Sequence, residues 1–136
     1  MANLLYPEGA EAITKGLVDL SSDSLRIALL NSTYTYSATD DFLDDIAGGE
    51  RVALAGSDLT SVVCSNGNVD AADYTFSTVA TGSTITSFVL YVHNASEAAA
   101  RLIMFQDKDS SDASISLATN GGSITVAFNA SGIFTI

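Results

Sequence analysis

The sequence predicts an all-β, mainly antiparallel fold: a single β-sandwich or jelly-roll-like domain of about seven or eight strands with a short N-terminal helix. Short apolar runs with alternating side chains recur along the chain, and turn residues separate them about every 8–12 residues. Pro7 is the only proline, so nothing prevents these runs from pairing as strands. A chain of 136 residues can bury a core of its own, and residues 1–136 are therefore predicted to form one domain.

The first predicted element after the N-terminus is a helix near residues 7–17. Pro7 suits the first helical position, and Glu8 and Glu11 suit the positive end of the helix dipole. Lys15 and Gly16 favour termination. The apolar face is predicted to consist of Ala10, Ile13 and Leu17.

A second short helix is predicted over residues 39–46, where Thr39 can act as the cap. Its apolar residues are Phe42, Leu43 and Ile46. Four carboxylates, at positions 40, 41, 44 and 45, gather in the same stretch and could hold a cation or form an acid/base pair. Four neighbouring negative charges on a surface turn are more simply explained as solvated, and that is the interpretation adopted.

The middle of the chain is predicted to form strands. Residues 24–31 carry Leu25, Ile27 and Leu29 in strict alternation. Asn66-Gly67 is a strong signal for a two-residue hairpin, with the chain returning near residues 74–79. The predicted strands of this region are residues 24–31, 58–64, 74–79, 83–94 and 100–107.

The C-terminal tail has no charged side chain after Asp112, although the whole protein has formal net charge −11. Three apolar runs, at residues 114–118, 123–129 and 132–136, predict a hairpin followed by a final strand. Exposed edge strands normally carry Lys, Pro or bulges that prevent unwanted pairing, and this tail has none of the charges or prolines. We therefore expect its edges to be covered inside the domain or by another chain.

The composition argues against several functional classes. A sequence pI near 4.1 and scattered cations disfavour nucleic-acid binding. No segment approaches the roughly 20 apolar residues that cross a bilayer, and the N-terminus lacks the features of a signal peptide, so we expect a soluble protein made in a cytoplasm. Only 15% of residues are charged, which indicates that part of the surface is buried against partners.

No residue pattern predicts catalysis, a metal or another cofactor. Cys64, the only cysteine, is interpreted as a small core hydrophobe, and His93, the only histidine, as a residue at a strand end. Asp107, Asp109 and Asp112 resemble the start of a calcium loop, but its glycine and its final glutamate are missing, so a solvated loop is predicted. The protein is therefore predicted not to be an enzyme.

The order of elements resembles a family of small tailed-bacteriophage virion proteins of about this length. The stretches that carry the resemblance are residues 1–31, 34–46, 69–79, 88–107 and 119–136, which together cover nearly the whole chain. A departure lies at residues 64–73, "CSNGNVDAAD", where the family often has a glycine-rich turn before its acidic segment. The departure bears on the geometry of the predicted hairpin at Asn66-Gly67 and not on the resemblance to the family.

The resemblance implies a structural protein of the phage particle, most like a capsid decoration (cement) protein on the exterior of the shell. Its implied partners are the major capsid protein and further copies of itself, as a trimer, with no nucleic acid and no membrane. A tail or neck component of the same particle is the first alternative. A carbohydrate-binding β-sandwich is the second, with Tyr34, Tyr36 and Tyr91 as a sugar platform.

Residues 1–6 precede the predicted helix and are interpreted in two ways. They form either an N-terminal arm that contacts the capsid through Leu4, Leu5 and Tyr6, or a segment that folds back onto its own domain. If the arm packs on a capsid subunit, burial of each of these side chains would contribute roughly 1.5–3 kcal/mol before ordering costs.

Overall fold

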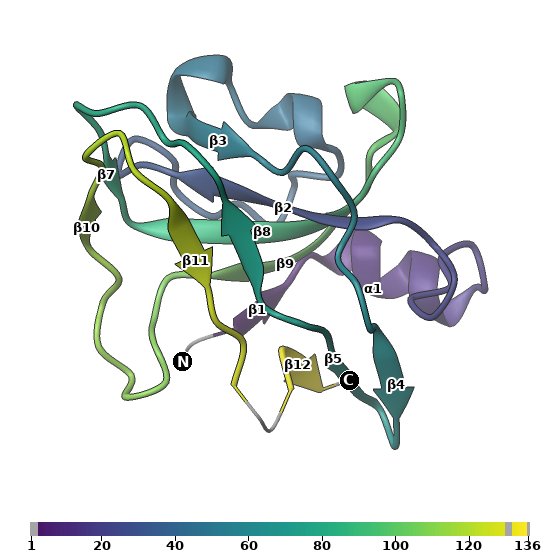
Figure 1. Ribbon diagram of the computed structural model, residues 1–136. Coiled ribbons are helices and arrows are strands. Elements are labelled where there is room, and N and C mark those ends of the chain that lie inside the picture. Colours follow the sequence, from purple (N-terminus) through teal and green to yellow (C-terminus); the bar gives the residue numbers. More distant parts are fainter. Residues whose placement is uncertain (1–2, 130–131, 136) are drawn as a thin grey trace.

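A five-stranded antiparallel sheet forms the centre of the molecule in the computed structural model, which describes residues 3–129 and 132–135 (Figure 1). Its strand order is β1–β9–β8–β2–β3. The bounds are β1 Asn3–Leu5, β2 Leu25–Leu30, β3 Arg51–Leu54, β8 Ser87–Val92 and β9 Leu102–Gln106. Strand pairing is antiparallel throughout the described residues, which confirms the predicted mainly antiparallel β class.

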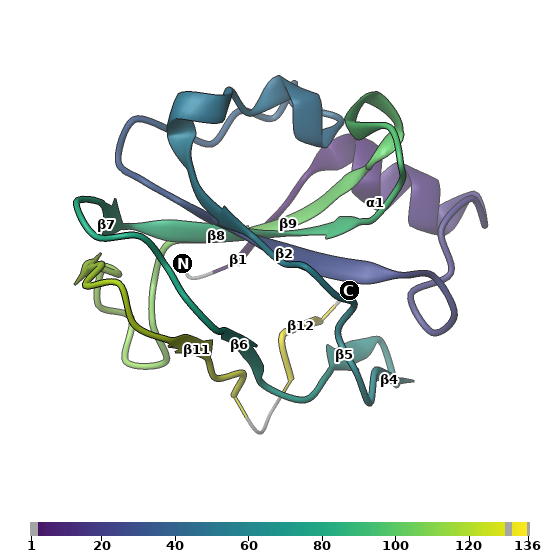
Figure 2. The same ribbon diagram turned by 45° about the horizontal axis from the view of Figure 1, so that its top comes forward.

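One face of this large sheet is covered by three short ladders, each of which pairs a tail strand with an earlier part of the chain (Figure 2). In the first, β10 (Leu117–Ala118) pairs with β7 (Thr84–Ile85), and in the second, β11 (Ile124–Val126) pairs with β6 (Tyr74–Phe76). The third has the order β12 (Phe134–Thr135), β5 (Asn68–Asp70), β4 (Val63–Ser65). This layer is therefore divided into separate ladders and is not one continuous second sheet.

The opposite face is covered by loops that contain three 3-10 helices, and the only α-helix of the described residues lies beside them (Figure 2). The 3-10 helices are η1 (Leu43–Asp45), η2 (Gly48–Glu50) and η3 (Glu97–Ala99). The second predicted helix, over residues 39–46, is thus reduced to the single turn of η1. No helix among the described residues is long and apolar enough to cross a membrane.

Two hydrophobic cores lie on the two faces of the large sheet. In β2, the alternation divides the side chains: Leu25, Ile27 and Leu29 belong to one core, and Ala28 and Leu30 to the other. The loop-side core consists of Tyr6, Ala28, Leu30, Tyr34, Leu43, Ile46, Val89, Tyr91, Ala100, Leu102 and Phe105. The ladder-side core includes Leu25, Ile27, Leu29, Val69, Phe76, Val79, Ile85, Phe88, Leu90, Ile133 and Phe134.

Helix α1 (Pro7–Thr14) lies so close to β9 that its contact face differs from the predicted one. A Cβ atom on Gly9 would be 2.3 Å from the Leu102 carbonyl oxygen, so only glycine fits there. The buried residues of the helix are Gly9 and Ala12, whereas Leu17 lies beyond the helix and is 69% exposed. The predicted apolar face is therefore correct only in part. Ile13 is half-buried against the ladder-side core and Ala10 is half-buried, as predicted. Leu17 is wrong, and the close approach to β9 selects the small residues Gly9 and Ala12.

The Asn66-Gly67 hairpin is confirmed, but its returning strand was placed too far along the chain. Asn66 and Gly67 have φ values of 52° and 79°, the left-handed conformation that a tight two-residue turn between β4 and β5 requires. The chain returns immediately, at Asn68–Asp70. The predicted partner near residues 74–79 instead contains β6, which pairs with the tail.

The tail strands do not form the predicted hairpin. Leu117 is paired with Ile85, Ile124 with Phe76, and Phe134 with Val69, so each tail strand pairs with a strand from the middle of the chain. This pairing turns alternate apolar side chains of the tail toward the ladder-side core. One edge of each tail strand is therefore covered inside the domain.

Candidate functional site

A cavity of about 750 Å³ lies between the large sheet and the tail, and we call it the tail groove. Its floor comes from the large sheet and β7, and its walls come from the tail. The floor is lined by Leu29, Ile85 and Phe88, one wall by Ile115 and Leu117, and the other wall by Ile124, Val126 and Phe128. In Figure 1 the corresponding segments are β10, β11 and the sheet behind them.

The tail groove exists because the covering layer is divided. Strands β10 and β11 each pair with a different partner and not with one another. Leu117 remains 47% exposed, and Phe128 is half-buried with its ring centroid 6.4 Å from that of Phe88. The two walls consequently present apolar side chains that the domain itself only half buries.

Alternation along β11 directs its side chains to two sides. Ile124 and Val126 pack against the ladder-side core, whereas Thr125 points outward and its hydroxyl lies 2.9 Å from that of Thr75 on β6. This is the period-2 pattern of a half-buried strand. The sequence therefore indicates which side chains of β11 face the core. It does not indicate that the two walls of the tail groove, near β10 and β11, stay apart.

The rim of the tail groove is formed by the loop at residues 107–115. One carboxylate oxygen of Asp109 accepts hydrogen bonds from the Ser111 N–H, the Ser111 hydroxyl and the Ala113 N–H. These bonds lower the pKa of Asp109, with the Ser111 hydroxyl making the largest contribution. Lys108 donates from Nζ to the Ser114 hydroxyl at 2.9 Å. Hydrogen bonds within the loop thus fix its shape.

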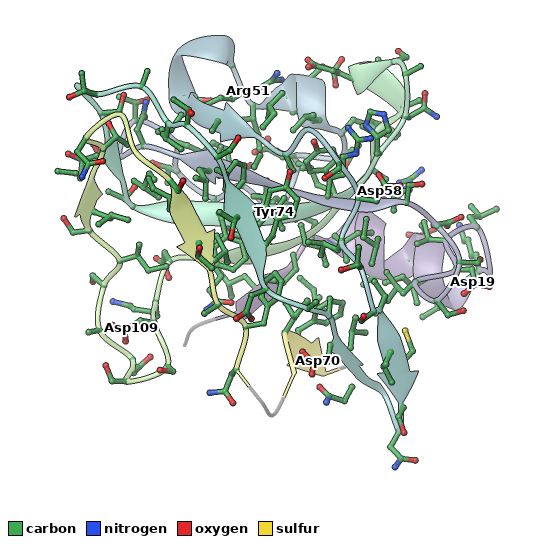
Figure 3. The ribbon with its side chains drawn as sticks, in the orientation of Figure 1. Asp19, Arg51, Asp58, Asp70, Tyr74 and Asp109 are labelled. Atoms are coloured by element: carbon green, nitrogen blue, oxygen red, sulfur yellow. The ribbon has the colours of Figure 1, made fainter. Side chains whose placement is uncertain are left out.

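The acidic residues are distributed around the molecule. Figure 3 shows Asp19, Asp58, Asp70 and Asp109 on separate parts of the structure. Within residues 3–129 and 132–135, no group of three or more carboxylate, histidine or cysteine side chains converges in a way that could hold a metal ion. The calcium-like run at residues 107–112 is therefore part of the groove rim and not an assembled ion site in this structure.

The acidic cluster near η1 makes local hydrogen bonds. Asp45 accepts from the backbone N–H groups of Asp41 and Phe42, at 2.8 and 3.0 Å, and so caps the 3-10 turn. Asp40 accepts a hydrogen bond of 2.8 Å from the Tyr34 hydroxyl. Burial, together with the neighbouring carboxylates, raises the pKa of Asp40 above its ordinary value, against the lowering effect of that bond.

A buried tyrosine network joins the N-terminal strand to this cluster. The hydroxyl oxygens of Tyr6 and Tyr34 are 2.7 Å apart. Since the single Tyr34 proton is donated to Asp40, Tyr6 is the donor to Tyr34. Burial raises the pKa of both phenols. The Tyr36 hydroxyl donates to the Leu5 carbonyl at 3.0 Å.

Two of the three tyrosines of the predicted sugar platform are not available on the surface. Tyr34 and Tyr91 are buried in the loop-side core, whereas Tyr36 is half-buried and packs against it. Rings of Tyr36 and Phe105 lie 5.5 Å apart, as is usual for packed aromatic side chains. The platform of three tyrosines is therefore wrong, because Tyr34 and Tyr91 cannot contribute to it.

The N-terminal segment folds back onto its own domain, which is the second of the two interpretations given for it. Leu4 and Leu5 pair with Phe105 and Met104 of β9, and the Tyr6 side chain is 0% exposed. Residues 3–6 are thus part of the domain and not a free arm. Leu4 remains exposed enough to touch a partner, Leu5 is half-buried, and Tyr6 has no surface to offer. Residues 1 and 2 lie outside the described residues.

Cys64 and His93 are both exposed. Cys64 lies on β4, an edge strand that extends past the core, so the prediction of a core cysteine is wrong even though its cross-strand neighbour Val69 is buried. Partial burial and, to a smaller degree, Asp19 raise the pKa of the thiol, which disfavours the reactive thiolate. His93 directly follows β8, and its backbone N–H donates to the Ser24 carbonyl at 2.7 Å.

On the loop-covered face of the large sheet, Arg51 holds the covering loops together. Its guanidinium donates from Nε to the Ile46 carbonyl at 3.0 Å and from Nη2 to the Leu43 carbonyl at 2.7 Å. It also donates from Nη1 to the Glu97 carboxylate at 2.9 Å, joining η1 to η3. The planar fork of an arginine suits three such acceptors at once.

No protein-family model matches the chain, and no curated protein matches its sequence significantly. Fold and surface together define a class: an acidic, mainly antiparallel β domain whose uncharged tail borders an open apolar groove.

Proposed function

We propose that this protein is a structural component of a tailed-bacteriophage particle that binds the exterior of the capsid and stabilises the shell, as a decoration protein does. Its partners in this role are the major capsid protein and further copies of itself, in a trimer. The role is one of binding and is not catalytic. The proposal combines the resemblance over nearly the whole sequence with the surface described above.

The observation that carries the proposal is the tail groove. Apolar side chains there are left half-buried on a stretch that contains no charge after Asp112. Exposed apolar patches on a soluble domain mark interaction sites, and the centres of protein interfaces are depleted of charged residues. A protein that completes its packing only on a larger assembly would have such a surface.

The charge distribution supports attachment to the outside of a shell. Lys15, Arg26, Arg51 and Arg101 each lie within 4 Å of a carboxylate, which leaves Lys108 as the cation with no ion pair among the described residues. A strongly negative domain is repelled by nucleic acid and by free copies of itself in solution. It would therefore stay dispersed until a complementary surface binds it.

Reconstruction of the virion that contains this chain tests the proposal. We expect many copies distributed over the capsid exterior, and added protein should raise the melting temperature of expanded shells that lack it, because binding to the folded shell stabilises it by mass action. A few copies at a single vertex or along the tail would instead assign the chain to the neck or tail. Absence from purified particles would overturn the proposal.

A further inference from the structure

Strand β11 has a free edge that faces the tail groove. It pairs with β6 on one side, and no described strand pairs with its other side. Across the groove, β10 likewise has a partner only in β7. Backbone N–H and C=O groups on such edges form hydrogen bonds readily with an added strand.

The side chains around this edge have the spacing that an added strand needs. Ile124 and Val126 point toward the groove at alternate positions, and Phe88 and Leu29 lie on its floor. A strand paired with β11 would place every second side chain into the same space, between Val126 and Leu117. A volume of about 750 Å³ lies within the range of binding pockets for small ligands and side chains.

The charges around the tail groove indicate which kind of added strand it would bind. Both walls are uncharged, so insertion would remove no ionised group from water. The rim carries Asp109 and Asp112 against Lys108, and the protein as a whole has net charge −11. A segment with apolar residues at alternate positions and Lys or Arg at its ends is complementary to this rim, whereas the tail of a second copy has no basic residue after Asp112 to pair with it.

We propose that the tail groove binds an extended segment of a different protein, with basic ends and alternating apolar side chains, as an additional strand on β11. This inference uses only the groove and its charges, and it does not depend on the virion role. Binding joins backbone hydrogen bonds at the edge to apolar contacts in the groove.

A peptide selection tests the proposal on the full-length protein. The probe is a pool of synthetic decapeptides with Val, Ile, Leu or Phe at alternate positions, Thr or Ser between them, and Lys at both ends. We expect the immobilised protein to enrich peptides from this pool over a pool with the same composition in scrambled order. Binding should weaken by more than tenfold in high salt, because charge complementarity contributes to it.

Two variants distinguish the groove from another sheet edge of the molecule, that of β3. Leu117→Lys places a charge on the groove wall and should weaken binding at least tenfold. Leu54→Lys is the matched control, since Leu54 is 39% exposed on β3, the far edge of the large sheet, and binding should be unchanged. Only every second N–H group of a peptide strand paired with β11 points toward β11. N-methylation of that set of alternate amides should therefore abolish binding, whereas methylation of the other set should leave it intact.

Several results would overturn the inference. These are equal enrichment of the scrambled pool, loss of binding in Leu54→Lys and not in Leu117→Lys, and binding that is insensitive to amide methylation in both registers. Saturation of the groove by a small apolar dye with no peptide enrichment would make it a small-molecule pocket. Concentration-dependent dimers that Leu117→Lys abolishes would identify a second copy as the occupant.

Discussion

The two faces of the large sheet differ in how completely they are covered. On the loop side, Arg51 bonds two loop carbonyls and Glu97, and the buried tyrosines hold the N-terminal strand against the same loops. On the ladder side, three short ladders leave an open groove. The comparison shows that side-chain hydrogen bonds fasten the covering on the loop side, whereas the covering on the ladder side leaves apolar side chains of the tail half-buried around the groove.

The largest contrast should appear when one leucine is truncated on each side. Leu30 is completely buried in the loop-side core, so Leu30→Ala should lower the free energy of unfolding by about 2–5 kcal/mol. Leu117→Ala, on the groove wall, should lower it by less than about 0.5 kcal/mol. Urea unfolding followed by circular dichroism measures both. Equal losses would mean that the groove is closed in solution and would remove the distinction between the faces.

Loss of the Arg51 bonds should have the next largest effect. Arg51→Ala removes the guanidinium donor from the Ile46 carbonyl and leaves the Leu43 carbonyl with only the Ile46 N–H, so it should lower the free energy of unfolding by about 1.5–3 kcal/mol. Glu97→Ala removes only the half-exposed ion pair and should lower it by less than about 1 kcal/mol. Thermal unfolding of the two variants in the same buffer separates these contributions. If Glu97→Ala matched Arg51→Ala, the ion pair and not the carbonyl bonds would hold the loops.

The tyrosine network should show a smaller effect that is not additive. Tyr34→Phe leaves both the Tyr6 hydroxyl and Asp40 without a partner, so it should lower the free energy of unfolding by about 1–2 kcal/mol. Tyr6→Phe removes one donor and leaves the bond from Tyr34 to Asp40, so it should cost less. A double-mutant cycle by denaturant unfolding should give a coupling of at least about 0.5 kcal/mol. Additive losses would show that the two hydroxyls act independently.

The smallest expected effect concerns pH. The pKa of Asp40 is raised in the folded state, so the folded protein binds that proton more tightly than the unfolded chain does. The contribution of Asp40 to stability therefore falls as pH rises from the ordinary pKa of 3.8 through the raised folded value, and it stays lower above that value. In Asp40→Asn this loss is absent, and the amide oxygen still accepts the Tyr34 proton.

The measurement is the difference in the free energy of unfolding between Asp40→Asn and the wild type, from pH 3 to pH 7. The difference should increase in favour of Asp40→Asn as the pH rises through this range. Glu97 and Asp58 have lowered pKa values, owing to their bonds with Arg51 and Arg26, and change stability in the opposite direction. Both are present in each protein and cancel in the difference. A flat difference would show that Asp40 has an unaltered proton affinity.

The central strands could be predicted from the sequence because their pattern is local. Strands β2, β8 and β9 lie within the predicted runs at residues 24–31, 83–94 and 100–107, where apolar residues are dense and turns flank each run. The left-handed turn at Asn66-Gly67 is equally local, since it depends on the conformational freedom of those two residues.

Pairing partners and exposure could not be predicted in the same way. Alternating apolar residues indicate a tail strand but are compatible with any pairing partner. The sequence therefore predicts a hairpin where the structure has ladders with β7, β6 and β5. Cys64 and Leu17 have apolar neighbours in sequence, yet Cys64 lies on an edge strand that extends past the core and Leu17 lies beyond the end of α1. The tail groove depends on the distance between two walls, and that distance is a property of the assembled layers.

The tail pairings are nested in the chain, and this arrangement has a consequence for folding kinetics. Leu117 with Ile85 closes the shortest of the three loops, Ile124 with Phe76 a longer one, and Phe134 with Val69 the longest. Loop-closure entropy grows with length, so each ladder becomes easier to form once the ladder inside it has closed. We expect the three ladders to form in that order, and the high contact order of such pairings makes folding slow compared with a helical protein of equal length. Until β11 has closed on β6, the nascent chain exposes several unpaired edges at once and is most prone to aggregation.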